Sequence, residues 1–235
     1  MLNPSSRHLV AGPAGPLELA LDLPREASAA RGIAYIGHPH PLFGGTLDNK
    51  VAATLARAYA ASGWLAIRPN FRGVGGSAGT HDEGRGETLD LLHLIDTESQ
   101  WLHPLLPQTL AHPPARALAG FSFGSFVAAQ VACQLFERGQ ALQTLVLAGT
   151  AAGKWALPSI PEPIRHRTLL IHGELDETIS LTHVLDWARP QHLSILVYPG
   201  VDHFFHRRLT HLRDHVVQHI AAHAQTKENP PIPPS

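Results

Sequence analysis

This sequence of 235 residues has little cysteine and little charge. Cys133 is its one cysteine, so an intramolecular disulfide is excluded. Asp, Glu, Lys and Arg make up 16% of the chain, with a net charge of −1 and no long run of one sign. This pattern excludes the electrostatic footprint of a nucleic-acid or anionic-membrane partner. No stretch is apolar enough to span a bilayer, and residues 1–15 lack a signal-peptide core, so we expect a cytoplasmic protein.

What is present suits one compact domain. Hydrophobic residues make up 44% of the chain, enough for a sizeable core. We predict a single domain over residues 1–226. Four prolines fall among the last eight residues, and we expect the tail, 227–235, to be a disordered or extended appendix. The chain also has 17 histidines, so a lone histidine carries less functional weight than usual.

Apolar runs of strand length alternate with helical patterns almost throughout. The predicted strands are Leu17–Leu23, Ile33–Gly37, Trp64–Arg68, Arg116–Phe121, Thr144–Ala148, Thr168–His172 and Ser194–Tyr198. The predicted helices are Asp48–Ser62, Thr88–Leu102, Ser125–Glu137, Thr178–Ala188 and Leu209–Ala224. This alternation favours an α/β fold: a mostly parallel twisted sheet with helices on both faces. Functional residues are then expected beyond the carboxyl ends of the strands.

The pattern Gly-x-Ser-x-Gly occurs at Gly120, Ser122 and Gly124. It follows a predicted strand and opens a predicted helix, which is the setting of a nucleophile elbow. Side chains two residues before and after the serine would crowd each other across the turn, so glycines fit there. The alternative is a glycine-lined turn in which Ser122 is only a cap. Ser125 is a weaker nucleophile candidate, because glycines do not flank it in this pattern.

A serine nucleophile needs a general base, and the base needs an orienting carboxylate. His203 follows the last predicted strand, in a loop opened by Pro-Gly, and is the candidate base. His206 is the second candidate, and Asp202 is expected to form the turn. The alternative for His203 is an ordinary surface histidine.

Asp176 is the candidate acid, since it lies in the loop after the strand that precedes the last one. Its alternative role is to cap the following helix. Three other carboxylates compete for the acid role: Glu162, Glu174 and Glu177.

The oxyanion of an acyl-transfer reaction needs two N–H donors. The first candidate is the backbone N–H of Phe123, directly after Ser122. The second is expected after the strand Ile33–Gly37, where the chain reads His-Pro-His-Pro-Leu. Prolines have no N–H, so His40 is the candidate donor and Leu42 the alternative.

Two groups of histidines raise the question of a metal. His38 and His40 lack the carboxylate or cysteine partners that a metal site needs, so we predict no metal and no cofactor. A second series recurs every fourth residue along the last helix and is interpreted as a polar stripe beside its apolar face. Its members are His211, His215, His219 and His223.

Five ordered motifs together resemble the α/β-hydrolase superfamily over nearly the whole chain. They are Gly37–Pro41, Pro69–Ser77, Gly120–Gly124, His172–Asp176 and Gly200–Phe205. The chain looks most like the small bacterial branch without a cap domain, near the dienelactone-hydrolase-like proteins and carboxylesterases. Dienelactone hydrolases use a cysteine where this chain has Ser122, so lactone specificity is not implied. Only residues 149–166 separate two strands where many relatives insert a cap, which is too short for one.

The resemblance implies a serine hydrolase that cleaves carboxylic esters through a Ser-His-Asp triad and an acyl-enzyme. Without a cap the site should be open, which favours a small ester substrate of short acyl chain. Alternatives are a thioesterase, peptidase or acyltransferase with the same triad, or a non-catalytic binding protein. Five phenylalanines are candidates for the acyl-binding wall: Phe43, Phe71, Phe121, Phe123 and Phe204.

Overall fold

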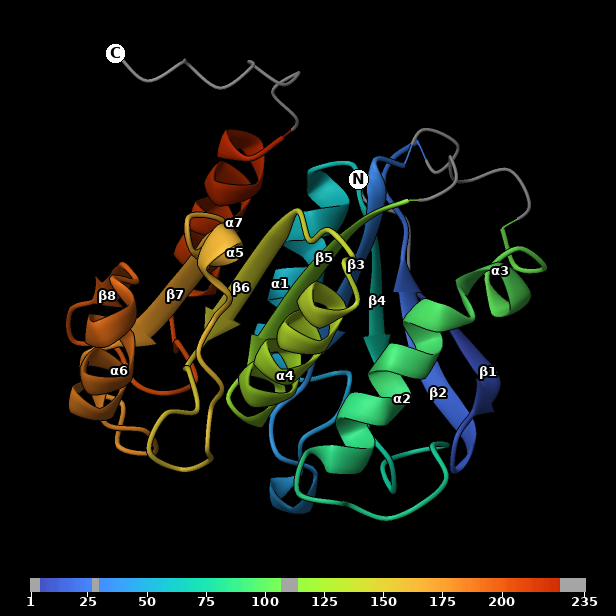
Figure 1. Cartoon of the computed structure of the whole chain (residues 1–235), viewed down its shortest axis with the longest axis horizontal. Helices are drawn as coiled ribbons and strands as arrows, with labels where there is room; N and C mark the ends of the chain where they lie inside the picture. Colours follow the sequence, from blue (N-terminus) through green and yellow to red (C-terminus); the bar gives the residue numbers. More distant parts are fainter. Residues whose placement is uncertain (1–4, 27–29, 107–113, 225–235) are drawn as a thin grey trace.

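The computed structural model describes residues 5–26, 30–106 and 114–224. Eight strands form one sheet in the order β1-β2-β4-β3-β5-β6-β7-β8 (Figure 1). Their bounds are β1 (Ser6–Gly12), β2 (Gly15–Asp22), β3 (Gly32–Gly37), β4 (Leu65–Pro69), β5 (Ala115–Phe121), β6 (Thr144–Ala148), β7 (Thr168–Gly173) and β8 (Ile195–Tyr198). β3 to β8 run parallel, while the β1–β2 hairpin joins β4 antiparallel. The predicted tail, 227–235, lies outside the described residues.

Helices cover both faces of this sheet (Figure 1). Their bounds are α1 (Lys50–Ala61), α2 (Arg85–Asp96), α3 (Glu98–Trp101), α4 (Phe123–Glu137), α5 (Glu162–Arg165), α6 (Leu181–Ala188) and α7 (Leu209–Ala222), with 3₁₀ turns η2 (Pro41–Phe43) and η3 (Arg189–Gln191). One buried cluster joins α2, α4 and α6 to one sheet face, and a second joins α1 and α7 to the other. Successive residues of a strand divide between them: Leu118 faces the first cluster and Ala119 the second. The predicted α/β architecture is therefore confirmed.

Two differences from the predicted elements have physical reasons. β1 was not predicted, because it is an edge strand whose side chains are exposed or only partly buried. The predicted helix Thr88–Leu102 is two helices, α2 and α3, since Thr97 leaves helical geometry at φ −108° and ψ 15°.

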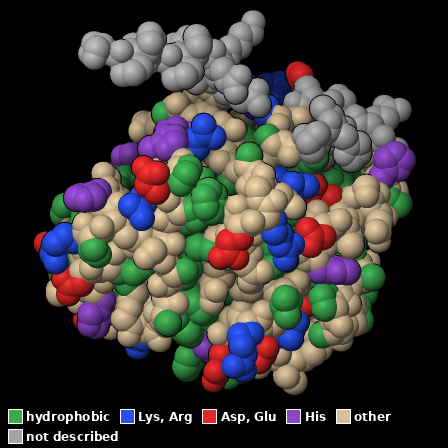
Figure 2. Space-filling model, in the orientation of Figure 1, with side chains coloured by type: hydrophobic (Ala, Val, Ile, Leu, Met, Phe, Trp, Pro, Cys, Tyr) green, Lys and Arg blue, Asp and Glu red, His purple; other side chains and the backbone are tan. Residues whose placement is uncertain are grey.

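The surface carries mixed charge. In the view of Figure 2, acidic and basic side chains are interspersed, and neither sign of charge dominates this face. In the described ranges, no helix has the length and apolar character needed to cross a membrane.

Candidate active site

Ser122 lies on the sharp turn between β5 and α4. Its backbone has φ 55° and ψ −122°, a conformation that costs a non-glycine residue roughly 1–3 kcal/mol. Neighbouring hydrogen bonds hold this strained turn. The Ser122 N–H donates to Ala148 O at 2.9 Å, and the Ser125 hydroxyl donates to Ser122 O at 2.6 Å. The Ser125 oxygen also accepts from the Ala151 N–H, so this second serine is buried and fully used in holding the turn.

The two flanking glycines are required by close backbone approach. A Cβ at Gly120 would lie 2.0 Å from Gly124 O, which is the crowding across the turn that the motif predicts. A Cβ at Gly124 would lie 2.3 Å from Gly37 O and 2.6 Å from His38 O. Gly124 therefore also lets the loop after β3 lie directly against the start of α4.

Ser122, His203 and Asp176 form a continuous chain of hydrogen bonds. His203 Nε2 lies 3.0 Å from Ser122 Oγ, and His203 Nδ1 lies 2.6 Å from Asp176 Oδ2. Since a carboxylate only accepts, Nδ1 carries the proton and Nε2 is free to accept from the serine hydroxyl. The three side chains come from loops after β5, β7 and β8, and each residue is at most 7% exposed. The arrangement is able to move a proton from the hydroxyl to the imidazole.

Backbone N–H groups bind the second carboxylate oxygen of Asp176. Its Oδ1 accepts from the N–H groups of Thr178 and Ile179 at 2.9 and 2.8 Å. These bonds form a turn ahead of the helix rather than a helix cap. Helix α6 begins later than predicted, at Leu181, and Ser180 caps it.

The alternative acids and base point elsewhere. Glu174 accepts from the Gly200 N–H and joins the two loops, and Glu162 and Glu177 are exposed. His206 is exposed and pairs with Asp202 at 2.5 Å. Asp202 also accepts from the His206 N–H, as expected of a turn-forming residue.

The loop after β3 is anchored by His38, which is buried. Its Nδ1 donates to Pro39 O at 2.6 Å, and its Nε2 accepts from the Phe71 N–H at 2.9 Å. Burial lowers the pKa of His38 to about 4, so the ring is neutral near pH 7. Both nitrogens are occupied, and among the described residues no group of three or more side chains could hold a metal ion.

His40 and Phe123 are placed beside one another by this anchored loop. Phe123 begins α4, so its N–H has no acceptor within the helix. Within the described chain, the His40 N–H also donates to no acceptor. The alternative donor, Leu42, gives its N–H to the Nδ1 of His40 at 3.2 Å.

The His40 ring lies in an aromatic cluster. Its centroid is 4.6 Å from that of His81, 5.0 Å from Phe123 and 5.5 Å from Trp155. Burial, and then the nearby His81, lower the pKa of His40. The cluster restrains the side chain of His40, the residue whose backbone N–H is the candidate second donor.

The candidate acyl-wall phenylalanines divide by exposure. Phe71, Phe121 and Phe123 are buried in the hydrophobic core, while Phe43 is 87% exposed and Phe204 is 47% exposed. Only these last two present a large apolar surface to solvent, one from η2 and the other beside His203.

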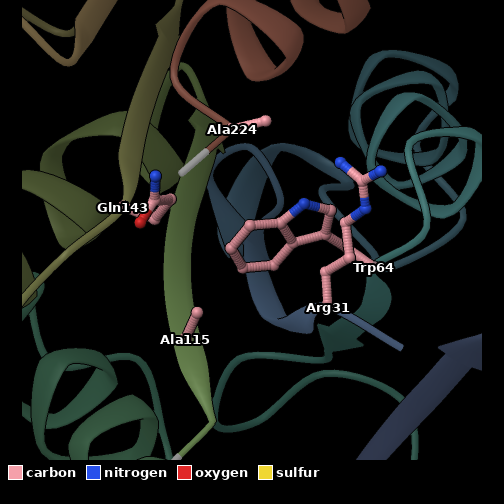
Figure 3. Close-up of a pocket in the computed structure, with 5 residues that line it drawn as sticks. All are labelled: Arg31, Trp64, Ala115, Gln143 and Ala224. Atoms are coloured by element: carbon pink, nitrogen blue, oxygen red, sulfur yellow. The ribbon is translucent and has the colours of Figure 1, made fainter. Parts of the chain in front are cut away.

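A cavity of about 450 Å³ lies at the opposite end of the sheet (Figure 3). Its lining includes Trp64 just before β4, Ala115 at the start of β5 and Gln143 just before β6. These are the amino ends of parallel strands, whereas Ser122 follows the carboxyl end of β5. The cavity is therefore separate from the candidate active site.

The histidine series on the last helix is partly structural. His215 Nδ1 is 2.6 Å from the Tyr198 hydroxyl, and His219 Nε2 donates to Arg167 O at 3.1 Å. Burial lowers the pKa of His219 to about 4. These two rings therefore dock α7 onto the sheet, beside the buried Leu212, Val216 and Ile220.

Sequence reasoning missed two histidines that contact this site. His172 lies 3.3 Å from Asp176 Oδ2, and His81 packs on His40 while its Nδ1 donates to the buried Glu87 at 2.8 Å. His172 also stands first in the motif His172–Asp176, whereas the sequence signal of His81 is its place after the predicted strand Trp64–Arg68.

Comparison with known proteins agrees with the fold. No family model matches the chain. A crystal structure from Xanthomonas campestris, described as an α/β serine hydrolase without a lid, is 32% identical, with a TM-score of 0.80 over 97% of this chain and 100% of that one. An α/β serine hydrolase homologue from Coxiella burnetii is also 32% identical, with a TM-score of 0.73 over 93% and 97%. An uncharacterised protein of Rickettsia prowazekii is 31% identical over 74% of this chain and 71% of its own length.

These similarities define the class of protein: it has the α/β-hydrolase fold, in a form without a lid. The chain belongs to the α/β serine hydrolases. The predicted fold and the predicted absence of a cap are thus confirmed, since only the four-residue α5 lies between β6 and β7. Membership supports a hydrolase function.

Proposed function

We propose that this protein hydrolyses carboxylic esters of short acyl chain, with Ser122 as nucleophile, His203 as general base and Asp176 as the acid that orients it. The observation that carries the proposal is the hydrogen-bonded chain from Asp176 Oδ2 through His203 to Ser122 Oγ. A pairing of this kind activates a hydroxyl that is otherwise a weak nucleophile. The substrate is a small-molecule ester.

In the first half of the reaction, Ser122 Oγ bonds to the ester carbonyl carbon as His203 Nε2 takes the hydroxyl proton. The N–H groups of Phe123 and His40 stabilise the oxyanion that forms, and one such donor contributes on the order of 10²–10³ in turnover. His203 then gives its proton to the leaving alkoxide as the carbon–oxygen bond breaks. In the second half, His203 deprotonates a water molecule, whose oxygen attacks the carbonyl carbon of the acyl-enzyme. The bond between that carbon and Ser122 Oγ then breaks, His203 returns the proton to Ser122 Oγ, and the carboxylic acid leaves.

The open site favours short acyl chains over long ones. With four-residue α5 as the one helix between β6 and β7, no cap domain exists there to enclose a long apolar chain. Phe43 and Phe204 offer exposed apolar surface at the rim, enough to contact a few carbon atoms.

A fluorophosphonate probe tests the nucleophile. The native protein should be labelled, and Ser122→Ala should not, while Ser99→Ala, at an exposed position on α3, should label as the native protein does. Absence of label on the native protein would favour a non-catalytic binding function.

The bond that is cleaved is tested with a panel of matched esters, thioesters and aminoacyl amides. We expect the highest kcat/KM for acetyl and butyryl esters and a decline toward long chains. A preference for thioesters or amides, with labelling of Ser122 intact, would keep the triad and replace the substrate class.

A further inference from the structure

His172 is a buried histidine that the proposed reaction does not use. It lies near the end of β7, and its side chain is fully buried. Its Nε2 is 2.9 Å from Ile179 O and 3.3 Å from Asp176 Oδ2. Both of these atoms are acceptors, so Nε2 must carry the proton.

The other ring nitrogen of His172 has no partner. Nδ1 is buried and, within the described residues, makes no hydrogen bond. Burial lowers the pKa of His172, because removal from water disfavours the charged form of the ring. The ring is therefore neutral, with its proton on Nε2 and an unsatisfied lone pair on Nδ1.

This unpaired nitrogen argues against a packing role alone. A buried polar atom without a partner destabilises the folded state, and an apolar side chain of similar shape avoids that penalty. What an apolar ring cannot supply is the N–H that donates to Ile179 O and whose nitrogen lies 3.3 Å from Asp176 Oδ2.

The contacts of His172 complete the set around the Asp176 carboxylate. Oδ1 accepts from the N–H groups of Thr178 and Ile179, and Oδ2 accepts from His203 and lies within reach of His172. Oδ1 thus accepts two backbone N–H bonds and Oδ2 accepts one from His203, while His172 gives its own N–H to Ile179 O. Ile179 is therefore held at both ends of its backbone, by Asp176 at the N–H and by His172 at the carbonyl oxygen.

We propose that His172 is a positioning residue of the active site: its Nε2–H donates to Ile179 O, fixes the turn whose N–H groups hold Asp176 Oδ1, and, with its nitrogen 3.3 Å from Oδ2, moderates the hold of the carboxylate on the His203 proton. This inference rests on the proposed triad. It adds a fourth residue that acts through Asp176 and does not touch the substrate.

The proposal has an electrostatic consequence for pH dependence. The polar N–H group of His172 has its nitrogen 3.3 Å from Asp176 Oδ2 and offsets part of the carboxylate charge. Without it, the carboxylate holds a proton on His203 more strongly, and the unprotonated base forms only at higher pH. The titratable groups that face His172 are Asp176, from the loop before α6, and His203, from the loop after β8. His203 itself is faced by Asp176 and by the Ser122 hydroxyl.

The test uses His172→Phe, with the best ester of the panel as substrate. Phenylalanine keeps the ring and removes the N–H, so we expect a kcat about tenfold lower. We also expect the acidic limb of the kcat/KM profile to move to higher pH. His172→Gln places an amide N–H near the position of Nε2, and it should restore both kcat and the acidic limb.

A merely structural role predicts a different result. The melting temperature of His172→Phe would then fall while kcat and the acidic limb stay unchanged, which overturns the proposal. If phenylalanine does not fit, His172→Leu removes the same N–H with a smaller side chain. If both apolar variants fail to fold and His172→Gln folds, the N–H serves the loop alone, and the proposal is also overturned.

Failure of this inference is distinct from failure of the proposed function. Fluorophosphonate labelling of Ser122 in the native protein tests the nucleophile without reference to His172. An unlabelled native protein removes the triad, whereas a labelled protein with an unaltered His172→Phe profile removes only the role of His172.

Discussion

Two buried histidines flank the candidate nucleophile, and they hold their loops differently. His38, next to the end of β3, uses both ring nitrogens and links two backbone segments on the side of the oxyanion donors. His172, near the end of β7, leaves Nδ1 unpaired and reaches the carboxylate on the side of the base. A fully bonded histidine can be explained by the fold alone, whereas one with an unpaired nitrogen calls for a further reason.

The same contrast extends to the two sides of Ser122. The oxyanion side is built from backbone: a loop anchored by His38 lies on Gly124, and its candidate donors are main-chain N–H groups. The base side is built from side chains that meet from separate loops. We therefore expect substitutions on the base side to act mainly on activity, and those on the oxyanion side to act on stability as well.

The largest effect is expected on the base side, from Asp176→Asn. The amide cannot accept at every position where the carboxylate does, so His203 loses its orientation and charge stabilisation. We expect kcat to fall by about 10⁴-fold. Steady-state kinetics on a short ester measure this, and Asp202→Asn in the exposed His206 pair is the control. A loss below tenfold would show that Asp176 is not the orienting acid.

On the oxyanion side, Gly124→Ala should act mainly on stability. Its Cβ would lie 2.3 Å from a backbone oxygen that cannot move aside. We expect a loss on the order of 3 kcal/mol in the free energy of unfolding, from urea denaturation. Gly139→Ala is the control: it has open space but φ +69°, and should cost about 1 kcal/mol. Equal losses would mean that close packing on Gly37 does not decide this position.

His38 predicts a pH dependence of stability. Its pKa is about 4 when folded against an ordinary 6.5, so the unfolded chain binds the proton more readily between these values. This contribution is fully present above pH 6.5 and is lost as the pH falls toward 4, by on the order of 3 kcal/mol. His38→Gln should therefore lose less stability between pH 7 and 4.5 than the native protein. His211→Gln, on an exposed position, should match the native protein, and parallel curves for all three would contradict the prediction.

The smallest effects are expected from substitution of the two exposed phenylalanine rings at the rim of the site. Phe43 lies on the oxyanion side and Phe204 on the base side. Replacing either with alanine removes apolar contact with an acyl chain, and we expect KM for a butyryl ester to rise about threefold. Phe136→Ala, an exposed ring at the far end of α4, should leave KM unchanged. The phenylalanine whose removal changes how KM depends on acyl-chain length marks the side of the site that binds the acyl group.

Much of the fold was predictable because its signals are local. The parallel strands are buried on both faces and read as apolar runs, and β6 matches its predicted bounds, Thr144–Ala148. β1 carries a weaker signal, since it pairs only with β2 and its side chains are largely exposed. The start of α6 depends on two side chains: Asp176 accepts from N–H groups ahead of the helix, and Ser180 accepts from the Thr182 N–H in its first turn.

The sequence by itself determined the elbow at Ser122, because two glycines, a strand and a helix are all local to that turn. It also determined the order of loops in which Asp176 and His203 stand. Only the tertiary structure brings these side chains into hydrogen-bonding contact, since Ser122 and His203 are 81 positions apart and meet only when β5 and β8 share a sheet. The contact of His172 with Asp176 is decided in the same way: four residues separate them, but the fold of the loop between β7 and α6 brings the imidazole to the carboxylate.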